Sequence, residues 1–251
     1  MKRPNALCIA AHDPSAGAGL LADIKTLESH DVYGCGITTG ITFQNDIMFQ
    51  GVEWMQYSNI NSQLLMVSER FDFEYAKIGM IKDLDMLDHI IALLYDTFPV
   101  IKIIWDPVMS TSSGFQIHFS FPFEKIIELA RDLYLITPNM EEIKMIFPEL
   151  SEENGAKLLA KKTNVLLKGG HAPGVESNDT LFTKAGKKIF ESKRIYDKEK
   201  HGTGCVLSSS IMANLTLGMK LNEACAEAKN YVEQFINSDD SLIGYHHNQI
   251  L

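Results

Sequence analysis

Short apolar runs alternate along this chain with longer segments in which apolar residues recur at helical spacing. Residues 6–11 (ALCIAA) form one such run, whereas Leu20, Leu21, Ile24 and Leu27 recur every three or four residues. Strands that alternate with helices predict a mostly parallel sheet that helices cover on both faces. The predicted fold class is therefore α/β, with a doubly wound sheet.

The alternation continues to the end of the chain. The predicted strands are residues 6–11, 71–80, 101–105, 133–136 and 165–167, and then a hairpin of 180–183 and 188–192. Residues 33–42 are rich in Gly and Thr but contain isoleucines typical of a strand. The predicted helices begin near residue 20 and then cover 83–97, 123–130, 140–146, 151–162, 204–217 and 222–236. No linker, repeat or low-complexity tract divides the chain, so residues 1–251 are expected to form one domain.

Charge and cysteine content narrow the class of protein. Lysine and arginine total 23 and aspartate and glutamate 32, which gives a formal net charge of −9. This balance argues against nucleic acid or an acidic membrane as a partner, because a protein that binds either of them needs a basic surface. No apolar run approaches the ~20 residues that a membrane span requires. The cysteines form neither a zinc pattern nor a dense disulfide framework, so a reducing cytoplasm is the expected location.

Polar clusters follow several of the predicted strands, and ligands of such sheets bind beyond the carboxyl ends of the strands. Residues 13–19 (DPSAGAG) form the first cluster. Three interpretations remain open for it: a dinucleotide site, for which Gly17-x-Gly19 is a weak match; a turn without a ligand; and a loop that lets the backbone approach a small substrate. A P-loop is excluded, because the chain has no G-x-x-x-x-G-K-[ST] pattern.

The second cluster is residues 200–205 (KHGTGC), which precede an apolar predicted helix. Two glycines let the backbone turn tightly, so that successive N–H groups at the helix start would point at one spot and form an anion hole. Cys205 lies in the first turn, where the helix dipole is expected to lower the pKa of its thiol. The alternative is a glycine-rich helix start with a buried cysteine.

Three further clusters follow predicted strands. Residues 106–109 (DPVM) come directly after the strand 101–105. Asn139 and Glu142 lie three residues apart after the next strand and would face one way at a helix start, either as ligands or simply as caps. Lys168, followed by two glycines and a histidine, is either a phosphate ligand or a solvated lysine.

Taken together, these clusters resemble the hydroxymethylpyrimidine and phosphomethylpyrimidine kinases of the ribokinase-like superfamily. The similarity extends in order over nearly the whole chain. It is found in Asp13-Pro14-Ser15-Ala16-Gly17-Ala18-Gly19, Ala22-Asp23-x-Lys25-Thr26, Gln44-Asn45, Lys77-Ile78-Gly79-Met80, Asp106-Pro107-Val108-Met109, Thr137-Pro138-Asn139-x-x-Glu142, Lys168-Gly169-Gly170-His171, His201-Gly202-Thr203-Gly204-Cys205 and Gly244-Tyr245-His246-His247.

The resemblance implies a ribokinase-like fold with the active site along the C-terminal edge of the sheet. It implies a small-molecule substrate and ATP with Mg²⁺. The γ-phosphoryl group would be transferred to the hydroxymethyl group of 4-amino-5-hydroxymethyl-2-methylpyrimidine and then to the resulting monophosphate, in thiamine biosynthesis. The alternative substrates are pyridoxal, pyridoxine and pyridoxamine, the pyridine alcohols of the related pyridoxal kinases. A homodimer is the expected assembly.

Individual residues receive expected roles in substrate binding from the resemblance. Gln44 is expected to hydrogen-bond the aminopyrimidine ring. The pocket around the ring is expected to be lined by Gly17, Ala18, Asp23, Met80 and Val108.

The phosphate-binding roles follow from the same resemblance. Asn139 and Glu142 are expected to organise Mg²⁺ and the ATP phosphates, Asp106 to contribute to ATP binding, and Lys168 to face the phosphate chain as a catalytic group. The anion hole is expected to consist of Gly202, Thr203, Gly204 and Cys205. The thiol of Cys205 would act as the general base, or the residue would contribute only its N–H.

Three positions depart from the family pattern. Ala16 stands where glycine is usual, His12 stands where a small polar residue is usual, and Phe43 adjoins Gln44, where an aromatic ring would widen or restack the pocket. Two other classes of protein remain as alternatives. A nucleotide-binding regulator would have lost site residues that are present here, and a redox enzyme would need a resolving cysteine near Cys205.

Overall fold

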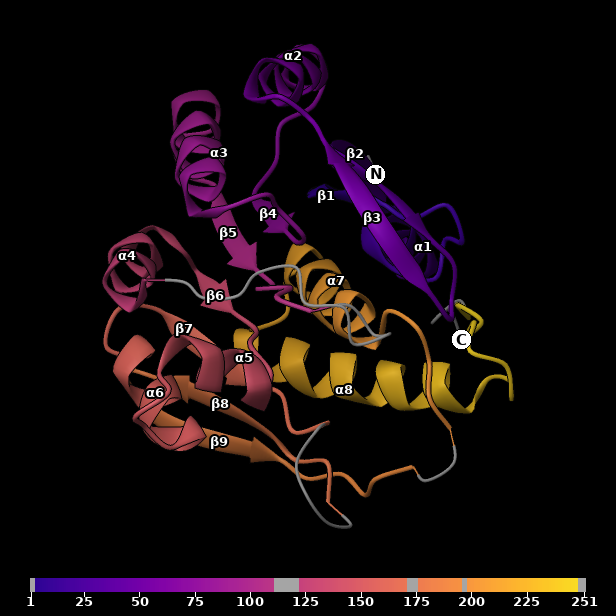
Figure 1. Ribbon diagram of the computed structural model, residues 1–251, viewed down its shortest axis with the longest axis vertical. Coiled ribbons are helices and arrows are strands. Elements are labelled where there is room, and N and C mark those ends of the chain that lie inside the picture. Colours follow the sequence, from indigo (N-terminus) through magenta and orange to yellow (C-terminus); the bar gives the residue numbers. More distant parts are fainter. Residues whose placement is uncertain (1–2, 111–121, 171–175, 196–197, 248–251) are drawn as a thin grey trace.

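A mixed sheet forms the centre of the computed structural model, which describes residues 3–110, 122–170, 176–195 and 198–247. Within these residues the sheet has nine strands in the order β3-β2-β1-β4-β5-β6-β7-β8-β9 (Figure 1). Strands β2, β1, β4, β5, β6 and β7 are neighbours that pair in parallel. The pairs at the two edges are antiparallel: β3 with β2, β8 with β7, and β9 with β8. Their bounds are β1 (Asn5–His12), β2 (Tyr33–Gln44), β3 (Phe49–Trp54), β4 (Tyr75–Ile78), β5 (Lys102–Trp105), β6 (Leu135–Ile136), β7 (Asn164–Leu167), β8 (Asp179–Thr183) and β9 (Gly186–Phe190).

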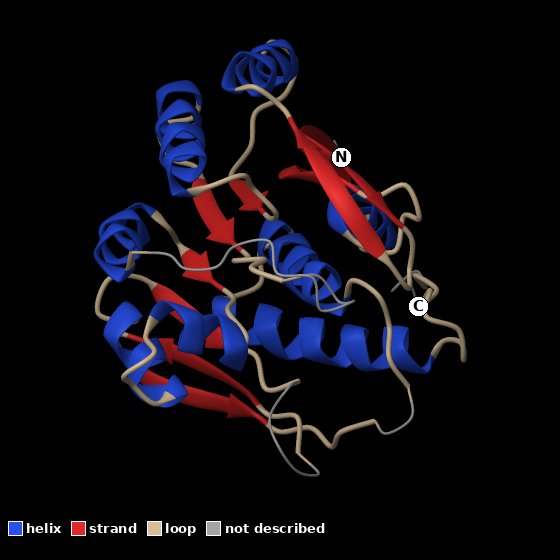
Figure 2. Ribbon diagram, viewed as in Figure 1, coloured by secondary structure: helices blue, strands red, loops and turns tan. Residues whose placement is uncertain are grey.

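Helices cover both faces of the sheet (Figure 2). The helices on one face are α1 (Gly19–Ser29), α7 (Thr203–Thr216) and α8 (Leu221–Asn237). Those on the other face are α2 (Tyr57–Ser68), α3 (Leu84–Thr97), α4 (Phe123–Leu129), α5 (Met140–Ile146) and α6 (Glu152–Leu159). No helix in the described ranges is both long enough and apolar enough to span a bilayer.

Strand alternation builds one hydrophobic core on each face. In β1, Leu7 and Ile9 contribute to the core beneath α2 to α6, whereas Cys8 and Ala10 contribute to the core beneath α1, α7 and α8. The central strands are therefore apolar on both sides, which explains the continuous apolar runs in the sequence.

The predicted doubly wound α/β sheet is confirmed, and the hairpin after β7 is present as β8 and β9. Strand β3 and helix α2 were not predicted from the sequence. Only Phe49 of β3 is buried, and only Ile60 and Leu64 of α2 are, so neither element has a clear apolar period. Both lie at the margin of the sheet, where few side chains need to be apolar.

The carboxyl ends of the parallel strands meet at one edge of the sheet. The segments that follow β1, β4, β5, β6 and β7 converge there, and α7 begins beside them. Asn139, which follows β6, forms an isolated parallel bridge with Lys168, which follows β7. Residues far apart in the sequence therefore share this edge.

Candidate active site

A cavity of about 600 Å³ opens at this edge of the sheet. It brings together all but two of the residues predicted for the site. Those that line it are Ala18, Gln44, Met80, Asp106, Val108, Asn139, Glu142, Lys168, Gly202, Thr203, Gly204 and Cys205. His171, the last residue of the lysine cluster, lies outside the described residues.

Gly17 and Asp23 are not among the described residues that line the cavity, so their predicted places in the substrate pocket stay predictions. A Cβ on Gly17 would lie only 2.6 Å from Cδ2 of His201, so this glycine is packed against the imidazole ring. Asp23 lies on the buried face of α1, where its Oδ1 is 2.5 Å from Nζ of Lys77 and neither side chain is exposed. Helix α1 directs this carboxylate at the sheet, because the α1 face that includes Asp23 packs on the core.

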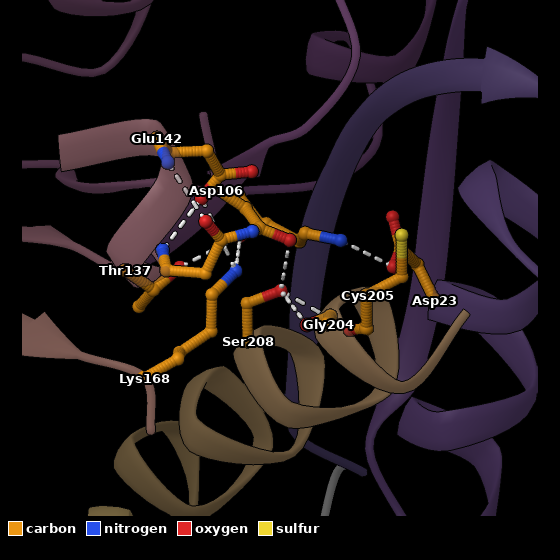
Figure 3. A network of polar contacts seen from close by, with 10 residues as sticks. Asp23, Asp106, Thr137, Glu142, Lys168, Gly204, Cys205 and Ser208 are labelled. Carbon is orange, nitrogen blue, oxygen red and sulfur yellow. Dashed lines mark hydrogen bonds and ion pairs between the residues drawn. The ribbon is translucent and has the colours of Figure 1, made fainter. Parts of the chain in front are cut away.

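Asp106, Glu142 and Lys168 form a charge cluster on one wall of the cavity (Figure 3). Lys168 Nζ lies 2.8 Å from Oδ1 of Asp106 and 3.8 Å from Oε2 of Glu142. Thr137 donates to Oδ1 of Asp106 at 2.9 Å, and Ser208 donates to its Oδ2 at 3.1 Å. The interpretation of Lys168 as a solvated lysine is therefore wrong, since its side chain is only 13% exposed and is ion-paired.

The charge cluster perturbs the pKa of each of its members. Burial and the neighbouring Asp106 raise the pKa of Glu142 to about 7, although Lys168 opposes this. The pKa of Asp106 is lowered, because Lys168, Lys77 and Thr137 together outweigh its burial. The pKa of Lys168 is raised, because the two carboxylates outweigh burial. One ammonium thus serves two carboxyl groups, of which Asp106 is ionised near neutral pH and Glu142 is close to its titration point.

Asn139 and Glu142 cap the N-terminus of α5. Asn139 Oδ1 accepts from the N–H of Glu142 at 2.8 Å, and Glu142 Oε2 accepts from the N–H of Asn139 at 2.6 Å. This capping box confirms the interpretation of Asn139 as a cap. It also fixes the carboxylate of Glu142 at the cavity wall, so a structural role and a place in the site coexist.

Gly202 has a backbone conformation that a residue with a side chain would resist. Its φ is +79°, and a Cβ would lie 2.1 Å from the carbonyl oxygen of Gly17. Helix α7 begins at the next residue, so the N–H groups of Thr203, Gly204 and Cys205 lie in its first turn at the cavity. A Cβ on Gly204 would be 3.4 Å from Lys168 Nζ, so these N–H groups and the charge cluster face the same space. The geometry is that of an anion site.

Cys205 does not have the lowered pKa predicted from its place in the helix. Burial raises the pKa of the thiol to about 11, with a further increase from Asp23 and Asp106. Lys77 and a hydrogen bond from the N–H of Gly19 act in the opposite direction but are outweighed. The thiol is therefore protonated near neutral pH, because desolvation of the thiolate exceeds the favourable field of the helix N-terminus.

Lys77 and the pair of His201 and Asp13 belong to the site although no individual role was predicted for them from the sequence. Lys77 is fully buried in β4 and lies beneath Cys205 with Asp23. His201 Nε2 lies 2.9 Å from Oδ2 of Asp13, which also accepts from the N–H of Ala18. A lysine inside the apolar strand YAKI is a usable signal, because a buried ammonium requires a partner.

The three departures from the family pattern have different consequences. Phe43 is 52% exposed, and neither it nor His12 is among the described residues that line the cavity, so the expected effect of Phe43 on the pocket is wrong. Alternation along β2 explains this, because Gln44 faces the cavity and its neighbour faces away. Ala16 has a φ of +57°, a conformation in which glycine is favoured.

Comparisons with known proteins agree with this arrangement. The family model described as phosphomethylpyrimidine kinase matches residues 13–250. The hydroxymethylpyrimidine/phosphomethylpyrimidine kinase of Salmonella typhimurium is 33% identical over 251 residues, which cover 96% of this chain and 94% of that protein.

Solved structures show the same fold. Phosphomethylpyrimidine kinase from Clostridium difficile 630 is 32% identical with a TM-score of 0.76, covering 92% of this chain and 98% of that one. Pyridoxal kinase from Staphylococcus aureus in complex with pyridoxal is 23% identical with a TM-score of 0.85, covering 99% of this chain and 95% of that one, and shows the shared ribokinase-like fold. Since the family match includes nearly every residue of the cavity and of both cores, the chain belongs to the phosphomethylpyrimidine kinase family.

Proposed function

We propose that the protein transfers the γ-phosphoryl group of ATP to the hydroxymethyl group of 4-amino-5-hydroxymethyl-2-methylpyrimidine, and then to the resulting monophosphate, in thiamine biosynthesis. The observation that supports this most directly is the convergence of Lys168 and the first turn of α7 on one cavity of a chain in this family. Phosphoryl transfer depends on positioning and on neutralising charge rather than on covalent catalysis, and both groups serve that purpose.

The proposed mechanism uses the cavity residues in three roles. The N–H groups of Thr203, Gly204 and Cys205 stabilise negative charge that develops on the transferred group. Lys168 holds the phosphate chain as a cation. Cys205 either accepts the proton of the substrate hydroxyl or contributes only its N–H. Because the pKa of its thiol is about 11 in the free protein, proton acceptance requires the bound substrate and phosphates to change that environment.

The charge cluster fits a magnesium ion that is bound together with nucleotide phosphates. The described residues contain no group of three or more His, Cys, Asp or Glu able to enclose a metal. Mg²⁺ usually takes only one or two carboxylates and completes its shell with water and phosphate oxygens. Glu142 and Asp106, which share one ammonium, are suited to that arrangement. When bound, Mg²⁺ would neutralise charge on the phosphate oxygens.

Gln44 and a small apolar patch beside it support a flat nitrogen heterocycle as the substrate. Gln44 lines the cavity, and Ala11, Phe49, Met80 and Val108 form a separate apolar cluster near it. The amide offers a donor and an acceptor, which match the amine and ring nitrogen of an aminopyrimidine. A pyridoxal ring offers a phenolic oxygen and a ring nitrogen instead, so it uses the same amide less completely.

The test is the substrate preference of the wild type and of Gln44→Leu. We expect a higher kcat/KM for the pyrimidine alcohol than for pyridoxal, and a loss of roughly 10–150-fold for the pyrimidine in the variant, with a smaller loss for pyridoxal. Gln234→Leu, an exposed substitution on α8, is the matched control and should change neither value. A wild type that prefers pyridoxal or pyridoxamine would overturn the assignment.

We also propose that the chain is one kinase domain, that it works in the cytoplasm, and that it forms a homodimer. Both hydrophobic cores share one sheet, which supports a single domain. All four cysteines are unpaired, which agrees with a reducing compartment.

The exposed apolar side chains of the β2–β3 hairpin support a dimer contact; they are Ile41, Phe43, Ile47 and Met48. Sedimentation analysis of the wild type and of Phe43→Glu tests the dimer.

A further inference from the structure

The chain that follows α8 returns to the segment that precedes Gly202. We call residues 239–246 the C-terminal strap; in Figure 1 it lies in the yellow part of the chain, which turns back beyond the end of α8 toward the N-terminal strands. The carbonyl oxygen of Leu242 in the strap accepts from the backbone N–H of His201 at 2.8 Å. The strap is therefore bonded directly to the residue before Gly202.

Lys200 holds the same strap through its side chain. Its ammonium group donates to the carbonyl oxygens of Asp239 and Ser241, and the residue is only 6% exposed. A buried ammonium must have hydrogen-bond acceptors, and these carbonyl groups are two of the acceptors it needs. Although Lys200 lines the cavity, its charged end is turned toward the strap.

The strap is in turn anchored on α8. His246 Nδ1 lies 3.0 Å from the hydroxyl of Tyr231, and its ring is 4.8 Å from that of Phe235. A Cβ on Gly244 would be 2.6 Å from the ring of Phe235, so the backbone approaches that ring closely. The far end of the strap is thus fixed, and the strap can act as a support for Lys200.

The segment of His201 and Gly202 is held on its other side by the loop that follows β1. His201 bonds to Asp13, and Gly202 approaches Gly17 so closely that a Cβ would be 2.1 Å from the Gly17 carbonyl oxygen. His201 and Gly202 therefore lie between two supports, the loop after β1 and the strap. Their position decides where the N–H groups in the first turn of α7 point.

We propose that Lys200 is a positioning residue for phosphoryl transfer: by holding the carbonyl groups of the C-terminal strap, it fixes His201 and Gly202 and so orients the N–H groups of α7. This inference rests on the proposed function, because it assumes that these N–H groups stabilise the transferred phosphoryl group. In this role Lys200 acts through the strap and not through a contact with either reactant.

The test compares Lys200→Met with Lys200→Arg and with Lys161→Met, an exposed lysine after α6. For each protein, kcat and the KM values for ATP and the pyrimidine alcohol are measured, and amide hydrogen exchange is followed in residues 200–205 and 239–246. We expect Lys200→Met to lower kcat about tenfold or more through misplacement of the loop, with KM for ATP nearly unchanged. Exchange should become faster in both segments, because they lose a shared support.

Lys200→Arg should recover most of the kcat and the slow exchange, since it keeps a cation with several donors. Lys161→Met should match the wild type in every measurement. If Lys200→Met does not fold, Lys200→Gln replaces it, because the amide can still donate to the two carbonyl groups; the same signs of change, smaller in size, are then expected.

Two results would overturn the proposal. A higher KM for ATP with unchanged hydrogen exchange would show that Lys200 binds the nucleotide instead. An unchanged kcat together with unchanged exchange would show that the strap does not support the loop. A wild type that phosphorylates no ring alcohol would refute the proposed function, whereas the exchange comparison would still decide whether Lys200 holds the two segments together.

Discussion

The two halves of the cavity are built in different ways. The charge cluster consists of side chains, Asp106, Glu142 and Lys168, which follow three different strands and compensate one another's charge. The segment 202–205 offers backbone N–H groups instead, and its geometry depends on a left-handed glycine and on a close approach to the loop after β1. One half is determined by the identity of its side chains, and the other by the absence of a side chain.

This difference predicts which substitutions each half of the cavity can tolerate. A substitution in the charge cluster that keeps the shape of the side chain removes a charge but preserves the backbone, so partial function should survive in altered conditions. A substitution that displaces the segment 202–205 misaligns several donors at once. Substitutions at four positions, from the largest expected effect to the smallest, test this contrast.

Gly202→Ala should have the largest effect. The new methyl group would lie 2.1 Å from the Gly17 carbonyl oxygen at a φ of +79°, so the segment must move. Removal of a single hydrogen-bond donor of this kind typically lowers kcat by about 10²–10³-fold. Because several donors are displaced here, we expect kcat/KM to fall by ~10³-fold or more.

The matched control for Gly202→Ala is Gly218→Ala. Gly218 also has a positive φ, +91°, but nothing lies within 4 Å of its Cβ position. This control should lose only about 1 kcal/mol of unfolding free energy and keep its activity. Equal losses of activity in the two variants would contradict the role given to the close approach.

Cys205→Ala tests whether a side chain also contributes to the segment 202–205, which otherwise acts through its backbone N–H groups. If the thiol is the base, kcat should fall by about 10²-fold or more while the protein stays folded. The wild type should then show a kcat/KM that rises with pH above neutrality, because the pKa of the thiol is about 11 and the thiolate fraction grows. The variant should lack this rise. A near-normal kcat would leave the N–H groups as the only contribution of this segment.

Glu142→Gln tests the charge cluster. We expect the Mg²⁺ concentration for half-maximal activity to rise on the order of tenfold, because a carboxylate binds this cation better than an amide. The wild type should itself need more Mg²⁺ as the pH falls below about 7, the pKa of Glu142, since the protonated acid is a poor ligand. Glu227→Gln, an exposed change on α8, is the control. An unchanged Mg²⁺ dependence would contradict this role.

The same variant has a consequence for stability. The pKa of Glu142 is raised in the folded protein to about 7, above the usual value for glutamate, so ionisation is resisted by the fold. The free energy of unfolding should therefore decline as the pH rises from about 4.5, the usual pKa, to about 7, and should level off above that. Urea denaturation at several pH values should show this decline in the wild type and a flatter profile in Glu142→Gln.

Ala16→Gly should have the smallest effect. Ala16 has a φ of +57°, which costs a residue with a side chain about 1–2 kcal/mol. Glycine removes that cost but loses more chain entropy on folding, so we expect a net gain of roughly 0.5–1 kcal/mol in unfolding free energy. Chemical denaturation measures it. A loss of stability would mean that the methyl group of Ala16 has packing contacts that outweigh the strain.

Much of the site was predictable because its residues are tied to local patterns. The strand ends, the glycines and the capping pair Asn139 and Glu142 can be recognised within a few residues of sequence, and the structure places them at one cavity. The ion pair of Asp23 with Lys77 could not be predicted, because the distance of Asp23 from the glycine loop in sequence does not reveal which way α1 turns its side chain. The marginal elements β3 and α2 were missed because so few of their residues are buried.

By itself the sequence determined the order of the strands and helices other than β3 and α2, the positions of the tight turns and the chemical types at the strand ends, since these depend on short-range periodicity and on the conformational range of glycine. Only the tertiary structure decided which charges meet. Lys77 pairs with Asp23, Lys168 serves both Asp106 and Glu142, and the C-terminal strap reaches Lys200. It also decided that the Cys205 thiol has a raised pKa, because burial depends on everything packed around a group and not on its neighbours in the chain.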